Sequence, residues 1–168
     1  MFLNSFDKSL TEEDAEKRFF KLNSNKDGNA IVVKDVILGD FPKKNNLILS
    51  FKYSRLSKLR FLTLPPTRCL NAEEKDQRIC KDYRKSVLRC KEKIIRKFIK
   101  KFGNYKIIES DYLKDQIYFW QSKNAQYYII IENLEEGTID LKVLINFEVS
   151  KDLDLSSYPF TPDRAAVR

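Results

Sequence analysis

The sequence predicts an α+β fold in which an antiparallel sheet of about six or seven strands packs on one long and one short helix. Apolar residues recur at steps of three and four between about residues 72 and 102, which is typical of a helix with one buried face. Residues 46–54 and 138–147 instead alternate between apolar and polar side chains, which is typical of strands. Gly, Asn and Pro residues separate these segments, as expected of turns.

The length of 168 residues fits one domain, which we place at residues 1–150. Residues 151–168 lack periodicity and contain Pro159 and Pro162, so we predict a flexible C-terminal tail. The order of helix, strands, helix and strands also fits two αβββ halves, although the halves share no residue-level repeat. One sheet covered on one face by both helices is the simpler alternative.

The short helix is predicted over residues 10–22. Ser9 and Glu12 form a capping box at its start, and Thr11 with Asp14 offers another in a shifted register. Polar residues then interrupt the apolar pattern, which indicates that the helix ends there.

The long helix is predicted over about residues 72–102. Asn71 is its expected N-cap, Gly103 ends it, and a break is expected near residues 75–78. The strands are expected at residues 30–38, 46–54, 58–64, 105–109, 116–121, 125–132 and 138–147.

Positive charge is concentrated in the middle of the chain. The formal net charge is +8, and residues 31–102 hold 20 Lys and Arg against 7 Asp and Glu. Such an excess is an electrostatic footprint for an acidic protein or for the phosphates of a nucleic acid. The candidate partner-binding residues lie in two clusters, one across the predicted strands 46–54 and 58–64 and one on the long helix: Lys52, Arg55, Lys58, Arg60, Arg89, Lys93, Arg96, Lys97 and Lys100.

Enzymatic readings have little support in the sequence. The chain has no histidine, which excludes Ser-His and Cys-His nucleophile systems, and its 4 glycines are too scattered for a phosphate-binding loop. We therefore predict a non-enzymatic binding or accessory protein that uses the basic helix face to engage an acidic macromolecular partner. We expect no catalytic residue, metal or cofactor. Non-specific nucleic-acid binding by the same surface is the alternative, and self-association stays open.

A small-ligand pocket between helix and sheet is a further alternative. Four aromatic residues of the C-terminal third are its candidate lining: Tyr105, Tyr118, Trp120 and Tyr128. The competing interpretation is that Trp120 packs in the core against the long helix.

The cysteines and the N-terminus predict a cytoplasmic protein. Cys69, Cys80 and Cys90 are odd in number, which disfavours a complete disulfide framework. Cys80 and Cys90 lie ~15 Å apart if they share a helix, so they cannot bridge each other. We therefore expect buried, reduced thiols. Residues 1–7 lack the features of a signal peptide, and no apolar run is long enough to span a membrane.

The segment after the short helix resembles the start of an EF-hand calcium loop. Asn23, Asn25 and Asp27 offer oxygen ligands at alternate positions, and Gly28 follows. Lys34 stands where the loop requires a bidentate Glu, so tight calcium binding is not expected. The competing interpretation is a polar turn with Gly28 at positive φ that leads into a strand.

The C-terminal third resembles small uncharacterised bacterial α+β proteins. The residues that carry this likeness are Lys101-Phe102-Gly103 after a helix, then Trp120 at a strand end, then Tyr127-Tyr128 and Gly137-Thr138 in a meander. The resemblance implies a fold and no activity. The last residues, Pro-Asp-Arg-Ala-Ala-Val-Arg, resemble the translated tails of integron gene-cassette proteins, which implies an origin in a mobile cassette.

Overall fold

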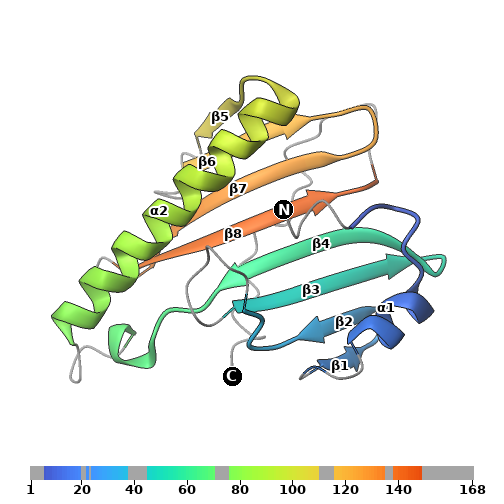
Figure 1. Ribbon diagram of the computed structural model, residues 1–168, viewed down its shortest axis with the longest axis horizontal. Helices are drawn as coiled ribbons and strands as arrows, with labels where there is room; N and C mark the ends of the chain where they lie inside the picture. The colour runs from blue at the N-terminus through green and yellow to red at the C-terminus, as the bar shows by residue number, and fades with distance from the viewer. Residues whose placement is uncertain are drawn as a thin grey trace.

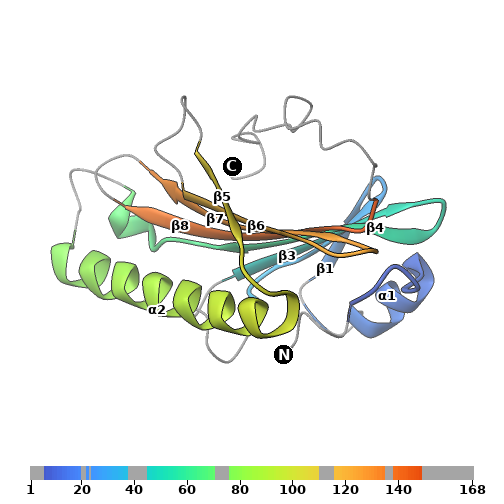
Figure 2. The same cartoon turned by 90° about the horizontal axis from the view of Figure 1, so that it is seen from above.

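The computed structural model describes residues 6–19, 22, 24–37, 45–70, 76–109, 116–134 and 138–148. One antiparallel sheet of 8 strands carries both α-helices on the same face, as Figures 1 and 2 show. The predicted fold class is therefore confirmed, with a strand more than expected. None of the helices in these ranges has the length and apolar character needed to cross a membrane.

The elements fall into two halves along the chain. The first half holds α1 Glu12–Phe19, β1 Ser24–Asp27, β2 Ala30–Val33, β3 Asn45–Lys52 and β4 Arg55–Thr63. The second half holds the short 3-10 helix η2 Thr67–Cys69, α2 Gln77–Phe102, β5 Lys106–Glu109, β6 Gln116–Gln121, β7 Gln126–Asn133 and β8 Ile139–Asn146.

Each half is a helix followed by a four-stranded meander. The strand order across the sheet is β1-β2-β3-β4-β8-β7-β6-β5, so the last strand of each half lies in the middle (Figure 1). β4 and β8 join the halves antiparallel, with Leu59 opposite Ile145 and Phe61 opposite Val143. The halves are thus αββββ units, and the predicted αβββ units were one strand too short.

The additional strand is β1, in the segment that resembles a calcium loop. Ser24–Asp27 pairs with β2 around a turn at Gly28, whose φ is 56°. The Lys26 ammonium lies 2.7 Å from a Glu12 carboxylate oxygen and 2.9 Å from one of Glu16, which ties β1 to α1. The EF-hand resemblance therefore does not extend to the structure, while the positive φ predicted for Gly28 is confirmed.

The helix starts differ in part from prediction. At α1 the predicted shifted register is used, because Thr11 Oγ1 caps the helix by accepting from the Asp14 amide at 3.1 Å. The Asp14 carboxylate accepts from the Thr11 hydroxyl at 2.7 Å, which differs from the bond to the backbone amide that a full capping box has. At α2 the N-cap is Asp76, whose side chain accepts from two backbone amides of the first turn. Asn71, the predicted cap, lies outside the described residues.

The main core lies between α2 and the sheet. The residues that α2 buries are Tyr83, Val87, Cys90, Ile94 and Phe98. They share one hydrophobic cluster with alternate residues of the central strands, including Phe61 and Val143. Burial of that stripe holds α2 across the sheet and directs its other faces toward solvent. A second cluster, built around Ile117, Tyr128 and Leu144, lies on the opposite face of the sheet.

A disulfide links the 3-10 helix to the first turn of α2, which corrects the prediction of reduced thiols. Cys69 and Cys80 are bonded with their Cα atoms 5.4 Å apart, while Cys90 is buried and takes no part in this disulfide. The prediction failed because an odd cysteine count excludes only a complete pairing of all cysteines. Thr138 donates to the carbonyl oxygen of Cys69 at 2.9 Å, so the bridged segment is also fixed to the start of β8.

Candidate functional site

The cationic face of α2 is the strongest surface feature that the structure describes. Within α2, eleven Lys and Arg stand against two acidic residues, Asp82 and Glu92. Five of the cations recur at steps of three and four and occupy a sector of about 100° beside the buried stripe. They are all exposed, and we call them the α2 cationic face: Arg89, Lys93, Arg96, Lys97 and Lys100.

The α2 cationic face has one acidic neighbour within the helix, Glu92. Glu92 lies 3.9 Å from the Arg96 guanidinium and 3.8 Å from the Lys91 ammonium. The Arg96 and Glu92 side chains are 80% and 57% exposed, so this pair contributes little to stability and leaves the guanidinium accessible. The buried apolar stripe of α2 fixes the helix against the sheet. The backbone that carries the five cations is therefore rigid.

The second predicted cluster does not join this face. Lys52 ends β3, where its ammonium lies 3.0 Å from the Glu148 carboxylate, and Arg55 donates to the carbonyl oxygen of Ser9 at 3.4 Å. Lys58 and Arg60 pair with Asn146 and Leu144 of β8. Because Leu144 belongs to the cluster on the opposite side of the sheet, Lys58 and Arg60 face away from α2.

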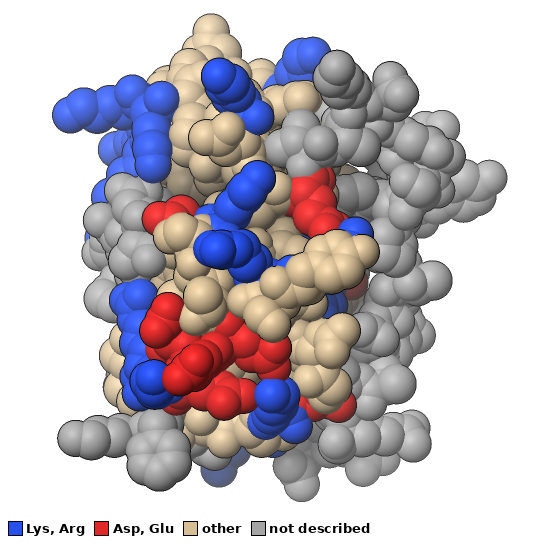
Figure 3. Space-filling view, turned by 90° about the vertical axis from the view of Figure 1, so that its right-hand side faces the viewer, with Lys and Arg blue, Asp and Glu red and all other residues tan. Residues whose placement is uncertain are grey.

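Carboxylates gather at the α1 end of the molecule, as Figure 3 shows. The first turn of α1 carries Glu12, Glu13 and Asp14, which suits the positive end of a helix dipole. Lys17 and Lys26 form ion pairs with carboxylates of this group. The two helices on one face of the sheet thus carry opposite charge, acidic at α1 and basic at α2.

Three of the four aromatic residues of the predicted pocket come together, and the fourth lies apart from them. Tyr105 packs against Tyr118 and Trp120 with ring centroids 5.1 and 5.5 Å apart. Trp120 is 2% exposed, and its Nε1 donates to the carbonyl oxygen of Gly103 at 3.0 Å. Tyr128 lies on the other face of the sheet, against Phe119. Trp120 is therefore a core residue, as the competing interpretation held.

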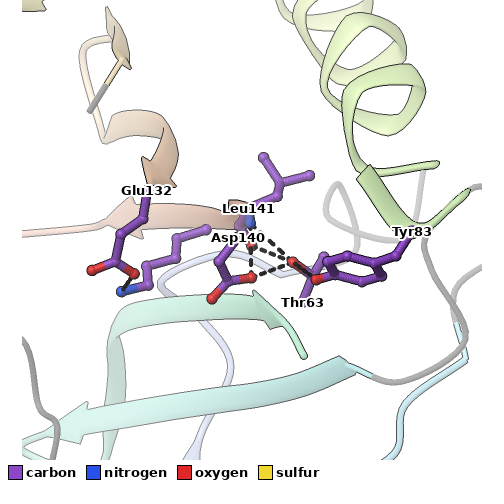
Figure 4. Close-up of polar contacts among 6 residues, drawn as sticks. Thr63, Tyr83, Glu132, Asp140 and Leu141 are labelled. Carbon is purple, nitrogen blue, oxygen red and sulfur yellow. Dashed lines mark hydrogen bonds and ion pairs between the residues drawn. The ribbon is translucent and has the colours of Figure 1, made fainter. Parts of the chain in front are cut away.

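A buried polar chain connects α2 to the centre of the sheet, and Figure 4 shows its geometry. Tyr83 on α2 donates to Thr63 Oγ1 at 3.1 Å, and Thr63 donates to the Asp140 carboxylate. The Leu141 amide donates to Asp140 Oδ1 at 2.8 Å. Burial raises the pKa of Asp140 to about 6, against the opposing effects of the Thr63 hydroxyl and the Lys142 charge. Burial likewise raises the pKa of the Tyr83 phenol.

This chain has the residue types of an acid–base relay but lacks access to a substrate. Asp140, Thr63 and Tyr83 are all buried, and their polar atoms are directed at one another. An ion pair of 2.5 Å between Lys142 and Glu132 lies beside Asp140. The arrangement therefore joins α2, β4 and β8, and we assign it a structural role. Sequence reasoning missed it because its members lie far apart in the chain.

The described residues contain no group of three or more Cys, Asp or Glu side chains placed to hold a metal ion. Asp27, from the segment that resembles a calcium loop, is one of these described residues and lies in β1. Asn23, the first predicted ligand position, lies outside the described residues.

Comparisons with known proteins give a distant structural likeness. No family model matches the chain, and no curated protein matches it. It is similar to the crystal structure of a DUF4309 family protein, YjgB, from Bacillus subtilis subsp. subtilis str. 168, with 12% sequence identity and a TM-score of 0.39. The match covers 82% of this chain and 78% of that chain. The predicted integron origin has no support in these comparisons.

Proposed function

We propose that the protein is a non-enzymatic binding protein that docks an acidic protein partner on the α2 cationic face. The observation that carries this proposal is the placement of five exposed cations in one sector of a helix whose buried stripe fixes their direction. Such a surface attracts acidic partners over a Debye length and steers them into register. Only the helix cluster enters the proposal, because Lys58 and Arg60 face the other side of the sheet.

The composition of α2 favours a protein over a single-stranded nucleic acid. Proteins that bind single strands place aromatic rings among the basic residues so that bases can stack on them. The aromatic residues of α2 are Tyr83 and Phe98, which are buried, and Phe102, which packs against the core. Stacking platforms are therefore lacking on the exposed side of this helix.

A charge-reversal variant tests the proposal. We expect Lys93→Glu, Arg96→Glu, Lys97→Glu and Lys100→Glu combined to weaken binding of a polyglutamate peptide by about 10-fold or more at low salt. The matched control reverses four exposed cations elsewhere: Lys34, Arg68, Lys106 and Lys123. Both variants change net charge equally, so a difference between them reports the location of the charge. Fluorescence anisotropy of a labelled peptide measures the dissociation constant.

Two results would contradict the proposal. Equal weakening in both variants would show that net charge alone drives binding. Tighter binding of duplex DNA or RNA than of polyglutamate at the same salt concentration would make the partner a nucleic acid, the alternative predicted from the sequence. Self-association stays a prediction, which sedimentation of the unlabelled protein checks.

The disulfide indicates in which cellular compartment the protein meets its partner. Bonds of this kind persist in oxidising compartments and are rare in the cytosol. The cytoplasmic location predicted from the sequence is untested, and the Cys69–Cys80 bridge argues against it. We therefore propose that the protein works in an oxidising compartment.

Thiol counting provides the corresponding prediction. Protein isolated without reductant and then unfolded should react with one equivalent of a thiol reagent, at Cys90, because Cys69 and Cys80 are bonded. After reduction the same protein should react with three. Three reactive thiols before reduction would support the cytoplasmic prediction instead. Mass spectrometry of the labelled protein gives the count and the positions.

A further inference from the structure

A cavity of 530 Å³ opens beside the C-terminal end of α2, on the helix face of the sheet. This volume falls in the range of ~300–1,000 Å³ found for small-molecule sites. Four segments far apart in the sequence line it: residues 6–9, the last turn of α2, the turn between β6 and β7, and the end of β8. Its lining is separate from the α2 cationic face and from the buried polar chain.

The walls of this cavity are aromatic and rigid. Phe98, Phe102 and Tyr127 pack on one another, with ring centroids 4.3 Å apart for Phe102 and Tyr127 and 5.6 Å for each of the other pairs. Ile145 is 2% and Ala125 1% exposed, so the apolar side of the cavity reaches into the core. Flat apolar walls held by mutual ring contacts suit an aromatic or alkyl body.

The polar side chains at the cavity favour an anion. Lys8 and Lys101 contribute two cations, against one carboxylate, Asp7. The Asp7 side chain already accepts from the Ser9 amide at 2.7 Å and from the Ser9 hydroxyl, and the hydroxyl bond is the main cause of its lowered pKa. Its charge is therefore compensated by local hydrogen bonds. The lining carries one more cationic side chain than acidic side chains, which favours a negatively charged ligand group.

The ring faces do not favour a ligand cation, although aromatic cages bind quaternary ammonium groups elsewhere. The Lys101 ammonium lies 5.1 Å from the centroid of the Phe102 ring, so this face already carries a cation of the protein. A second positive charge beside it would be repelled. We propose that this cavity binds a small amphipathic organic anion, with its apolar body against the aromatic walls and its carboxylate toward Lys101 and Lys8.

Three probes with the same ring and different charge test this site. 1-Naphthoate is the anion, 1-naphthylmethanol the neutral analogue, and (1-naphthylmethyl)trimethylammonium the cation. We expect naphthoate to bind with a dissociation constant on the order of 0.1–1 mM. It should bind about 3-fold or more tightly than the alcohol, and the cation most weakly. Amide shifts of Lys101, Ser122, Asn124 and Ala125 in ¹H–¹⁵N spectra locate the probe.

Two adjacent lysines provide a matched pair of variants. Lys101→Met should weaken naphthoate binding about 3-fold and leave the alcohol unchanged, whereas Lys100→Met, outside the cavity lining, should change neither. Asn124→Trp places a large ring at an exposed lining position and should weaken both probes about 10-fold or more, because the volume is then filled. All three positions are exposed, so these variants are expected to fold.

The outcomes separate this site from the proposed function. Charge reversal on the α2 cationic face should weaken polyglutamate binding about 10-fold or more and retain the naphthoate shifts at Ser122 and Ala125. The inference is overturned by the absence of saturable shifts, by equal or tighter binding of the cationic probe, or by equal effects of the Lys100 and Lys101 variants. Shifts confined to the opposite face of the sheet would overturn it as well.

Discussion

Replacing Trp120 with alanine should lower the free energy of unfolding by about 3–5 kcal/mol, the range found for large aromatic core residues. Trp120 is 2% exposed and packs edge-on against Phe98 of α2, with ring centroids 5.2 Å apart. Its loss would leave a void between the end of α2 and β6 that neighbouring rings fill only in part. Urea denaturation followed by far-UV circular dichroism measures the change, because the variant has no tryptophan fluorescence.

The conservative variant separates packing from hydrogen bonding. Trp120→Phe keeps a ring in place but removes the Nε1 donor to the Gly103 carbonyl oxygen, so we expect a loss of only about 1–2 kcal/mol. Gly103 is exposed, and water can replace that donor. A loss under ~1 kcal/mol for the alanine variant would contradict the core role and favour a surface role for the ring.

Relative to wild type, the Asp140→Asn variant should be more stable at neutral pH than it is at acidic pH. Burial raises the pKa of Asp140 to about 6, from an ordinary value of 3.8. The folded state therefore holds a proton that the unfolded state releases between these two values, and ionisation of Asp140 costs stability as pH rises through that window. This difference corresponds to ~3 kcal/mol. Asparagine does not titrate and avoids the cost.

The measurement is the difference in unfolding free energy between variant and wild type across pH. We expect it to shift in favour of the variant by about 2–3 kcal/mol between pH ~4 and ~7.5, because effects of other groups cancel in the comparison. Among the residues that the structure describes, the charged and titratable groups that act on Asp140 are Tyr83 from α2, Glu132 from β7 and Lys142 from β8. A difference that is flat across this range would show that Asp140 titrates near its ordinary pKa.

The substitution Thr63→Val tests the same buried polar chain at a second residue. The Thr63 hydroxyl donates to the ionised carboxylate and so lowers its pKa. Removing the hydroxyl should raise the Asp140 pKa further, which ¹³C chemical shifts of the carboxyl carbon follow. A lower Asp140 pKa in this variant would contradict the donor role of Thr63.

The fold was predictable where side-chain periodicity was strong. The stripe of α2 and the alternation in β3 and β8 gave the correct elements, because burial of one face dictates both patterns. β1 was missed because Ser24–Asp27 is an exposed edge strand of four polar residues, with no apolar side chain to mark a face. Its pairing depends on a turn and on ion pairs to α1, which a pattern of hydrophobicity does not record.

The candidate sites were predictable to a lesser degree. The exposure of Arg89, Lys93 and Lys97 followed from helical spacing alone. The sequence could not place Lys58 and Arg60, since alternation assigns them to one side of a strand without saying which side α2 covers. The cavity and the Tyr83–Thr63–Asp140 chain were out of reach for another reason, because each depends on segments that only the tertiary structure brings together.

The central position of β4 and β8 has a consequence for how the chain is made. Residues 64–138 separate the two strands in the sequence, although they are neighbours in the sheet. At translation rates of ~5–20 residues per second, β4 emerges roughly 4–15 s before its partner. During that interval the ladder groups of β4 on its β8 side lack their partner strand, while the other side can already pair with β3. The nascent protein is thus open to intermolecular strand pairing until β8 leaves the ribosome, and holdase chaperones should associate with it in that interval.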